Sequence, residues 1–218
     1  MLLIIFIIGA CFGSFIECMA YRYVMHESVL GRSHCDHCNH TLHLLDLIPV
    51  FSYIFSKGRC RYCHHELNQS LLWNELAAGF LFGMFYLKRG YDYRTFIILG
   101  CFLYASRVDM QVYEIPDLSI LISLIFTLRV YYLKETILFI GLLGLFVFGF
   151  NRITHKEGLG GGDIKLLMVC CISGGLYHTL CILSLSCLSG LLYCLWKKEE
   201  MIPFGPFITL GYIFMTLI

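Results

Sequence analysis

The sequence predicts an all-α polytopic membrane protein with about eight transmembrane helices and one small cytoplasmic zinc-ribbon-like loop. Of its 218 residues, 58% are hydrophobic and only 14% are charged, which excludes an ordinary soluble domain. Apolar runs recur that are long enough to cross a bilayer, since about 20 helical residues span a hydrocarbon core of ~30 Å. One sizeable polar segment interrupts them, and it carries two Cys-x-x-Cys pairs.

The apolar runs fall into eight predicted spans, at 2–22, 70–87, 94–107, 117–134, 136–152, 164–176, 178–196 and 203–218. A single helix over 164–196 would be roughly 50 Å long, too long for a bilayer even when tilted. Ser173-Gly174-Gly175 supplies a break there, so two spans are predicted. The first two spans and the loop 23–69 form an N-terminal part, 1–90, and the other six spans form a second part, 91–218.

The first span lacks the basic start and small-residue cleavage site of a secretory signal, so we expect it to remain in the membrane. With the N-terminus outside, eleven basic residues fall on the cytoplasmic side and five on the other, as the positive-inside rule requires. The cytoplasmic set is Arg22, Arg32, Lys57, Arg59, Arg61, Arg107, Arg152, Lys156, Lys165, Lys197 and Lys198, against Lys88, Arg89, Arg94, Arg129 and Lys134. The Lys88–Arg94 loop opposes this orientation locally.

Four of the twelve cysteines form Cys35-x-x-Cys38 and Cys60-x-x-Cys63 in the polar loop. Two such pairs at this separation are typical of a zinc ribbon, in which four thiolates close a structural site. Metal binding would then fold a loop too small to build its own core. The alternatives are two short disulfides, which a cytoplasmic location disfavours, unpaired thiols, or a site of three cysteines and one of the loop histidines.

The remaining cysteines lie in apolar spans, where cysteine behaves as a small hydrophobic residue. They are Cys11, Cys18, Cys101, Cys170, Cys171, Cys181, Cys187 and Cys194. A net charge of +1, without any basic stretch interleaved with aromatics, gives no indication of nucleic-acid binding.

Two aspartates, Asp109 and Asp163, lie at the ends of predicted spans. An ionisable group at the edge of a bilayer is costly to place and therefore marks a functional site. Each also has a structural interpretation, because Asp163 suits a helix N-cap and Asp109 a cap or an ion pair with Arg107. The helix dipole favours the Asp163 anion, but the sequence leaves the roles of the two carboxyls open.

The residues around the two aspartates indicate a functional site less strongly. Asp117 follows Pro116 where a helix start favours both residue types, so it is interpreted as structural or supporting. Gly160, Gly161 and Gly162 are predicted to form a loop that an extended substrate could approach. A phosphate-binding loop is excluded because the Gly-Lys-Ser/Thr sequence and a preceding strand are missing.

A series of short motifs follows one another along the chain. They are Gly13-Ser-Phe15, Tyr21-Arg22, Arg32-Ser-His-Cys35 with Cys38, Asp46-Leu-Ile-Pro49, Lys57-Gly-Arg-Cys60-Arg-Tyr-Cys63, Glu75-Leu76 with Gly79, Asp109, Ile115-Pro-Asp117, Gly160-Gly-Gly-Asp163-Ile-Lys165 and Pro203-Phe-Gly-Pro206. In these motifs and their order the chain resembles the type 4 prepilin peptidases, which are membrane aspartic proteases of the GxGD class. One departure is Glu17, where that family usually has Asn.

The resemblance implies an enzyme of the bacterial plasma membrane that cleaves the leader of prepilin-like precursors at the cytoplasmic face. Asp109 and Asp163 would be catalytic, and the Gly160–Gly162 segment, Lys165 and Asp117 would bind substrate or support the site. Many members also N-methylate the new N-terminus with S-adenosylmethionine, for which the sequence shows no site. In size the chain is most similar to enzymes serving competence pseudopili of Gram-positive bacteria. The alternatives are a proton-coupled transporter using both aspartates and a non-catalytic zinc-ribbon scaffold.

Overall fold

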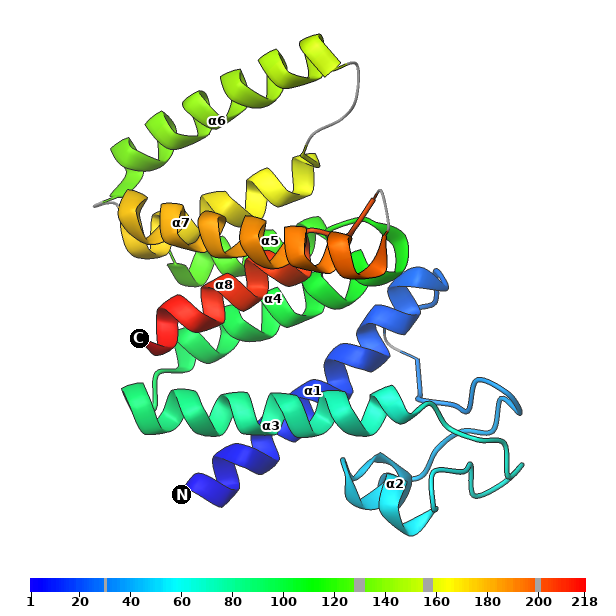
Figure 1. Cartoon of the computed structure of the whole chain (residues 1–218). Helices are drawn as coiled ribbons and strands as arrows, with labels where there is room; N and C mark the ends of the chain where they lie inside the picture. Colours follow the sequence, from blue (N-terminus) through cyan, green and yellow to red (C-terminus); the bar gives the residue numbers. More distant parts are fainter. Residues whose placement is uncertain (30, 128–131, 155–158, 199–200) are drawn as a thin grey trace. The chain divides into compact units, whose positions relative to one another are not determined.

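The computed structural model describes residues 1–218 apart from 30, 128–131, 155–158 and 199–200, and the named elements of this part are all helices (Figure 1). The helices are α1 (Leu2–Val24), η1 (Leu44–Leu47), α2 (Phe51–Phe55), α3 (Gln69–Arg89), α4 (Tyr93–Val112), α5 (Asp117–Thr127), α6 (Leu133–Thr154), α7 (Gly161–Lys197) and α8 (Gly205–Leu217). The described part of the chain has isolated β-bridges but no strand, which confirms the all-α prediction. Two residues used to predict orientation, Arg129 and Lys156, lie outside the described residues.

Five helices are long and apolar enough to cross a membrane, namely α1, α3, α4, α6 and α7, so the protein is a multi-pass membrane protein. When the two halves of α7 are counted separately, each of the eight predicted spans contains a helical segment. The lengths differ from the prediction in places. Helices α5 and α8 have 11 and 13 residues, fewer than the ~20 needed for a full crossing, and α4 continues past residue 107 to Val112.

The chain divides into two compact units, Met1–Asp92 and Tyr93–Ile218. In the first unit, α1 packs along α3. Gly9 and Gly13 make this possible, because a Cβ on either would lie within 2.8 Å of an atom of α3. The side-chain amide of Asn74 donates to Glu17 Oε2 at 2.9 Å, so Glu17, the departure from the family motif, also joins α1 to α3.

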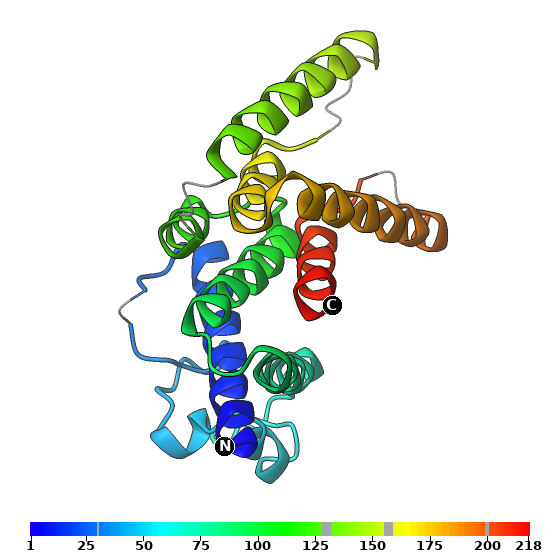
Figure 2. The same cartoon turned by 90° about the vertical axis from the view of Figure 1, so that its left-hand side faces the viewer.

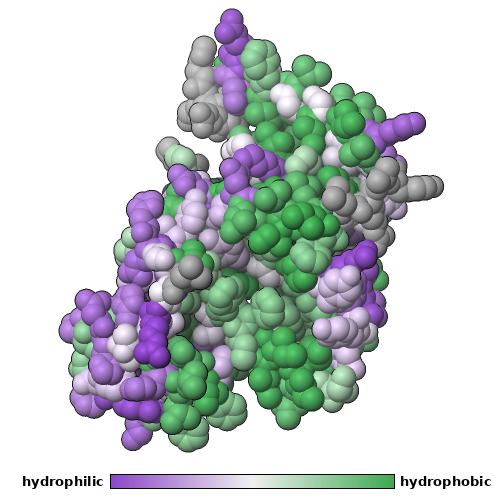
Figure 3. All heavy atoms as spheres, turned by 180° about the vertical axis from the view of Figure 1, so that it is seen from behind, coloured by the Kyte–Doolittle hydropathy of each residue, from purple (hydrophilic) through white to green (hydrophobic). Residues whose placement is uncertain are grey.

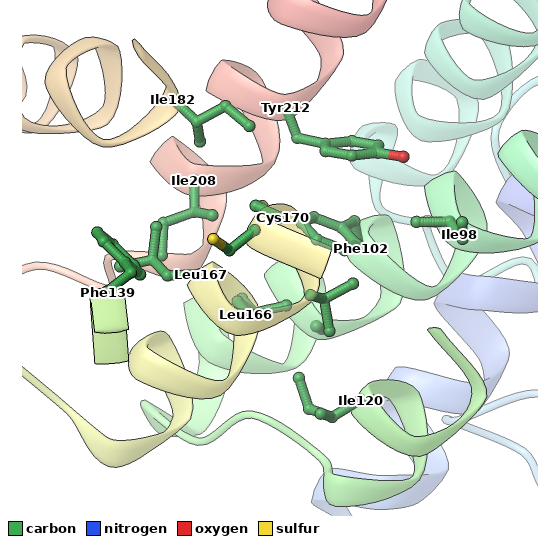
Figure 4. Packing of buried hydrophobic residues seen from close by; sticks show 13 residues of the cluster. Ile98, Phe102, Ile120, Phe139, Leu166, Leu167, Cys170, Ile182, Ile208 and Tyr212 are labelled. Atoms are coloured by element: carbon green, nitrogen blue, oxygen red, sulfur yellow. The ribbon is translucent and has the colours of Figure 1, made fainter. Parts of the chain in front are cut away.

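The second unit has a core contributed by α4, α5, α6, α7 and α8 (Figure 4). Phe102 of α4 stacks on Tyr212 of α8 with ring centroids 4.5 Å apart, and Leu166, Leu167 and Cys170 of α7 are fully buried in the same cluster. Helix α6 contacts α7 and lies at the outer edge of this unit (Figure 2). The core therefore fixes the ends of α4, α7 and α8 relative to one another.

Helix α7 is broken at Gly175, as the Ser173-Gly174-Gly175 sequence predicted. The backbone there has φ 79° and ψ −179°, a conformation essentially restricted to glycine. The N–H of Leu176, which starts the second half, donates to Glu135 Oε2 of α6 at 2.8 Å. A carboxylate of α6 thus caps the second half of α7, a contact that the sequence did not indicate.

We expect Gly175→Ala to destabilise the protein by about 1–3 kcal/mol because of its backbone conformation alone. The added Cβ would also lie 2.9 Å from the Tyr132 ring. Thermal unfolding of the purified protein in detergent would measure the loss. Gly144→Ala of α6 is the matched control, since nothing lies within 4 Å of its Cβ position, and an equal loss in both variants would contradict the prediction.

Candidate active site and metal centre

Asp109 lies in the last turn of α4 and is only 5% exposed. Its Oδ2 accepts a hydrogen bond from the backbone N–H of Gly205 at 2.8 Å. Gly205 is the first residue of α8, so the carboxyl group of Asp109 faces the positive end of a helix. The sequence predicted this aspartate at the end of a span, whereas the structure extends the helix beyond it and buries the side chain.

Asp163 lies in the first turn of α7 and is half-buried. Its carboxylate interacts with the N–H of Gly160 and lies close enough to Asp109 for the two charges to interact. Its Oδ1 is buried without a hydrogen-bond partner, which is costly for a carboxylate. The structure therefore brings both predicted aspartates into one site of the second unit, with one carboxyl oxygen left for a further partner.

The three glycines before Asp163 do not form the predicted loop. Helix α7 begins at Gly161, so Gly161 and Gly162 are helical and Gly160 is the N-cap. A Cβ on Gly162 would lie 2.9 Å from the Cβ of Ile115. The absence of a side chain at Gly162 thus lets the first turn of α7 approach the segment between α4 and α5, and Gly160 is the glycine that precedes the helix.

Asp117 and Lys165 form an ion pair with each other, between the first turns of α5 and α7. Both are exposed, with side chains 79% and 48% accessible. An exposed ion pair contributes about 0–1 kcal/mol, so this pair adds little to stability. That Asp117 supports the site stays a prediction.

The four loop cysteines gather in the first unit. Their Sγ atoms all lie within 4.8 Å of one another, and those of Cys35 and Cys63 are 3.9 Å apart. Four thiolates around a zinc ion at ~2.3 Å would be roughly 3.8 Å apart, so this spacing fits a tetrahedral site. All twelve cysteines are free in this structure, and no histidine among the described residues joins the cluster.

The two halves of this cluster repeat the same backbone pattern. The N–H of Cys35 donates to His40 O and that of Cys60 to His65 O. Asn39 and His64 occupy equivalent positions, both with positive φ, and donate to the carbonyls of Cys35 and Cys60. A short bridge closes each half, His34 with Thr41 and Arg59 with Glu66. Such paired knuckles are the geometry expected of a zinc ribbon.

The backbone also favours thiolates in the cluster. Burial raises the pKa of the Cys60 thiol, but N–H groups of Cys63 and Tyr62 and the neighbouring thiols outweigh burial and lower this pKa to about 7. The Cys35 sulfur likewise accepts from the N–H groups of Cys38 and His37, although burial keeps the pKa of that thiol above its usual value. A metal ion binds thiolates, so these donors suit a metal ligand set.

Asp46 joins η1 to the second knuckle, a role that the sequence did not reveal. Its carboxylate accepts from Tyr62 Oη at 2.8 Å and from the His43 N–H at 3.1 Å, and it pairs with Arg61 at 3.1 Å. Although burial opposes the charge, these partners lower the pKa of Asp46. The only sequence signal was its place in the Asp46-Leu-Ile-Pro49 motif. Gly205 was likewise indicated by the sequence only through its place in the Pro203-Phe-Gly-Pro206 motif.

Comparison with known proteins gives matches over nearly the whole chain. Residues 7–89 match the bacterial peptidase A24 N-terminal domain, and residues 96–195 match the type IV leader peptidase family. A prepilin leader peptidase/N-methyltransferase of Bacillus subtilis is 30% identical over 98% of this chain and 92% of its own length. One from Pectobacterium carotovorum is 28% identical, covering 84% and 72%. A type 4 prepilin-like proteins leader peptide-processing enzyme of Escherichia coli is 26% identical, covering 84% and 74%. No solved structure matches significantly.

Proposed function

The chain belongs to the type IV leader peptidase family, and we propose that it is an aspartic endopeptidase that removes the leader of prepilin-like precursors. The observation that carries this proposal is the pair of carboxyl groups, Asp109 and Asp163, held in one site by three helix ends. Two neighbouring carboxyls share a proton because both cannot ionise cheaply together. Such a pair can activate water and polarise a peptide carbonyl at the same time.

We assign the anion to Asp109 and the shared proton to Asp163. The Gly205 N–H and the N-terminus of α8 stabilise a negative charge on Asp109. Asp163 Oδ1, buried without a partner, favours a neutral carboxyl that can donate to a carbonyl oxygen. This reverses the sequence-based preference for an Asp163 anion, which considered only the start of α7.

In the reaction, Asp109 takes a proton from water as the water oxygen attacks the scissile carbonyl carbon. Asp163 gives its proton to the carbonyl oxygen, so the intermediate is a neutral gem-diol. The C–N bond then breaks as the leaving nitrogen gains the proton held by Asp109, and Asp163 regains one from the diol. Protons balance over the cycle, and each carboxyl returns to its starting state.

The substrate would be a precursor with a short basic leader before an apolar helix, and the site would open at the cytoplasmic face of the plasma membrane. The excess of basic residues on the predicted cytoplasmic side supports this orientation. Competence pseudopilins of Gram-positive bacteria are the proposed substrates, since the chain covers 92% of its Bacillus subtilis relative. The comparisons give no support to the transporter alternative.

A second activity follows from the names of the relatives, which are N-methyltransferases as well as peptidases. We propose that the new N-terminus is methylated with S-adenosylmethionine, without assigning a site to this donor. Cys35, Cys38, Cys60 and Cys63 would hold a structural zinc ion, since four thiolates leave no open position for chemistry. The metal would stabilise the fold of the loop.

The test is incubation of the purified full-length protein, in detergent, with a pseudopilin precursor and S-adenosylmethionine. Mass spectrometry should show loss of the leader and one added methyl group on the mature N-terminus. An active relative run in parallel is the control for substrate quality. Failure of this protein to cleave a precursor that the relative cleaves would overturn the proposal.

Gly205→Ala should lower kcat for leader cleavage by about 10²-fold, the cost of misplacing a reacting group by ~1 Å. The added Cβ would lie 2.8 Å from Asp109 Oδ2, so the carboxylate must move while the helix can stay. The measurement is steady-state cleavage together with thermal unfolding. Gly190→Ala is the control, because its Cβ would meet the flexible end of Ile202 at 3.3 Å and would otherwise make ordinary 3.7 Å contacts with the Phe204 and Phe207 rings. Unchanged kcat in the Gly205 variant would remove this contact from the mechanism.

A further inference from the structure

An apolar surface lies in the otherwise polar loop between α1 and α3. It is made by η1 and α2, which we call the η1–α2 segment, residues 44–55. Its large side chains are open to the surroundings, Leu44 being 85% and Phe55 76% exposed. The other exposed members are Leu45, Leu47, Ile48, Phe51 and Ile54. Figure 3 shows hydrophobic side chains directly beside the hydrophilic ones at the lower left of the view. So many exposed apolar groups together mark an interaction surface.

The η1–α2 segment is fastened to a membrane span. The backbone N–H of Val50 donates to Glu75 Oε2 at 2.6 Å, and Glu75 is a buried residue of α3. Glu75 is the seventh residue of that helix, roughly 9 Å from its start at 1.5 Å per residue. The polar region on each side of the hydrocarbon core is roughly 5–8 Å thick. The bond therefore holds the segment beside the first two turns of α3, near the end at which this span enters the bilayer.

The backbone at this bond is strained. Val50 has φ 65° and ψ −52°, and the Phe51 N–H donates to Pro49 O at 2.7 Å across it, which makes a γ-turn with positive φ. A β-branched residue adopts this conformation at a cost of order 1–3 kcal/mol unless its surroundings impose it. The Glu75 carboxylate is the partner that fixes the Val50 N–H. The strain shows that the position of the segment against α3 is specified.

Neighbouring residues match a membrane interface. Trp73, two residues before Glu75 in α3, is 66% exposed, and tryptophan is enriched where headgroups begin. Lys57 follows α2 directly and is exposed, as are Arg59 and Arg61, which also pair with Glu66 and Asp46. Basic residues beside an apolar segment bind anionic headgroups while the apolar side chains enter the acyl boundary.

We propose that the η1–α2 segment is an interfacial anchor that inserts its leucine, isoleucine and phenylalanine side chains into the leaflet where α3 begins. The occupant of this surface is the protein's own bilayer, because the segment is bonded to the first turns of a membrane span and exposes its apolar side chains there. The anchor holds the four-cysteine cluster at the membrane surface, since Asp46 of η1 binds Tyr62 and Arg61 of the second knuckle. The segment is thereby a membrane-binding element in addition to the transmembrane helices.

The test uses tryptophan fluorescence in proteoliposomes of phosphatidylcholine and phosphatidylglycerol. Both native tryptophans, Trp73 and Trp196, are replaced by phenylalanine, and a single reporter is introduced as Phe55→Trp. Lipids brominated near the upper acyl chain should quench most of its emission, whereas aqueous acrylamide should quench little. His64→Trp is the matched control, because His64 is exposed on a knuckle of the same loop. Acrylamide should quench this reporter, and the brominated lipids should not.

Quenching of the Phe55→Trp reporter by acrylamide and not by brominated lipid would overturn the proposal. A second outcome would also overturn it: acrylamide quenches the reporter in the protein alone and no longer does so after a pseudopilin precursor is added. That result would assign the surface to the substrate instead. Ile54→Trp, which is 57% exposed in the wild type at the neighbouring position, repeats the measurement if the first variant does not fold. The readout needs no catalysis, so it is independent of the proposed peptidase activity.

Discussion

Asp109→Asn and Asp163→Asn are each expected to abolish leader cleavage while the protein stays folded and inserted in the membrane. Asparagine keeps the size of the side chain and its ability to accept from the Gly205 or Gly160 N–H, but it cannot carry a proton through the reaction. Loss of a general acid or base costs at least about 10²-fold in rate. Cleavage of a pseudopilin precursor, measured beside thermal unfolding of each variant, separates a chemical loss from a structural one.

Asp117→Asn is the matched control for that experiment, because it removes a third carboxylate near the same helix ends. Its side chain pairs with Lys165 on an exposed surface, so we expect activity close to that of the wild type. Substantial cleavage by either Asp109→Asn or Asp163→Asn would exclude that residue from the catalytic pair. A loss in Asp117→Asn as severe as in the other two would mean that the ion pair with Lys165 sets the site geometry.

The hydropathy of the chain was sufficient to predict its helices, because a bilayer requires long apolar runs with internally paired backbones. It also located the break in α7, since Ser173-Gly174-Gly175 interrupts a run too long for one crossing. The ends of helices were less accurate. Helix α4 continues past Asp109 to Val112, because core packing of α4 against α5 and α8 extends it beyond the apolar run.

The site could be predicted as a set of residues but not as a set of contacts. Gly205 lies 96 positions after Asp109, and only the folded core brings its N–H to that carboxylate. The glycines before Asp163 suggested an open loop, yet Gly161 and Gly162 are helical because a close approach to Ile115 needs no side chain there. Spacing alone identified the four cysteines, since two short Cys-x-x-Cys turns fix most of the ligand geometry locally.

We expect one zinc ion per chain. A single serine substitution of any cluster cysteine, Cys35, Cys38, Cys60 or Cys63, should remove it. Serine lacks the thiolate that zinc needs, and three remaining ligands leave the site open to water. Elemental analysis of protein purified without chelator would measure the metal. Cys11→Ser is the matched control, because Cys11 is a free cysteine of α1 in the same unit and lies outside the cluster, so it should keep the full metal content.

The loss of zinc should act through the fold of the loop, because a closed site of four cysteines offers no position for substrate chemistry. The contacts between the two knuckles besides the metal are ring contacts such as His37 with His65, so the loop would lose its structure with the metal. We expect methyl transfer to fall at least as far as cleavage, since the aspartate pair belongs to the other unit. Absence of zinc from the wild-type protein would disprove the metal assignment. Serine variants that lose zinc and keep both activities would restrict the metal to a role in stability.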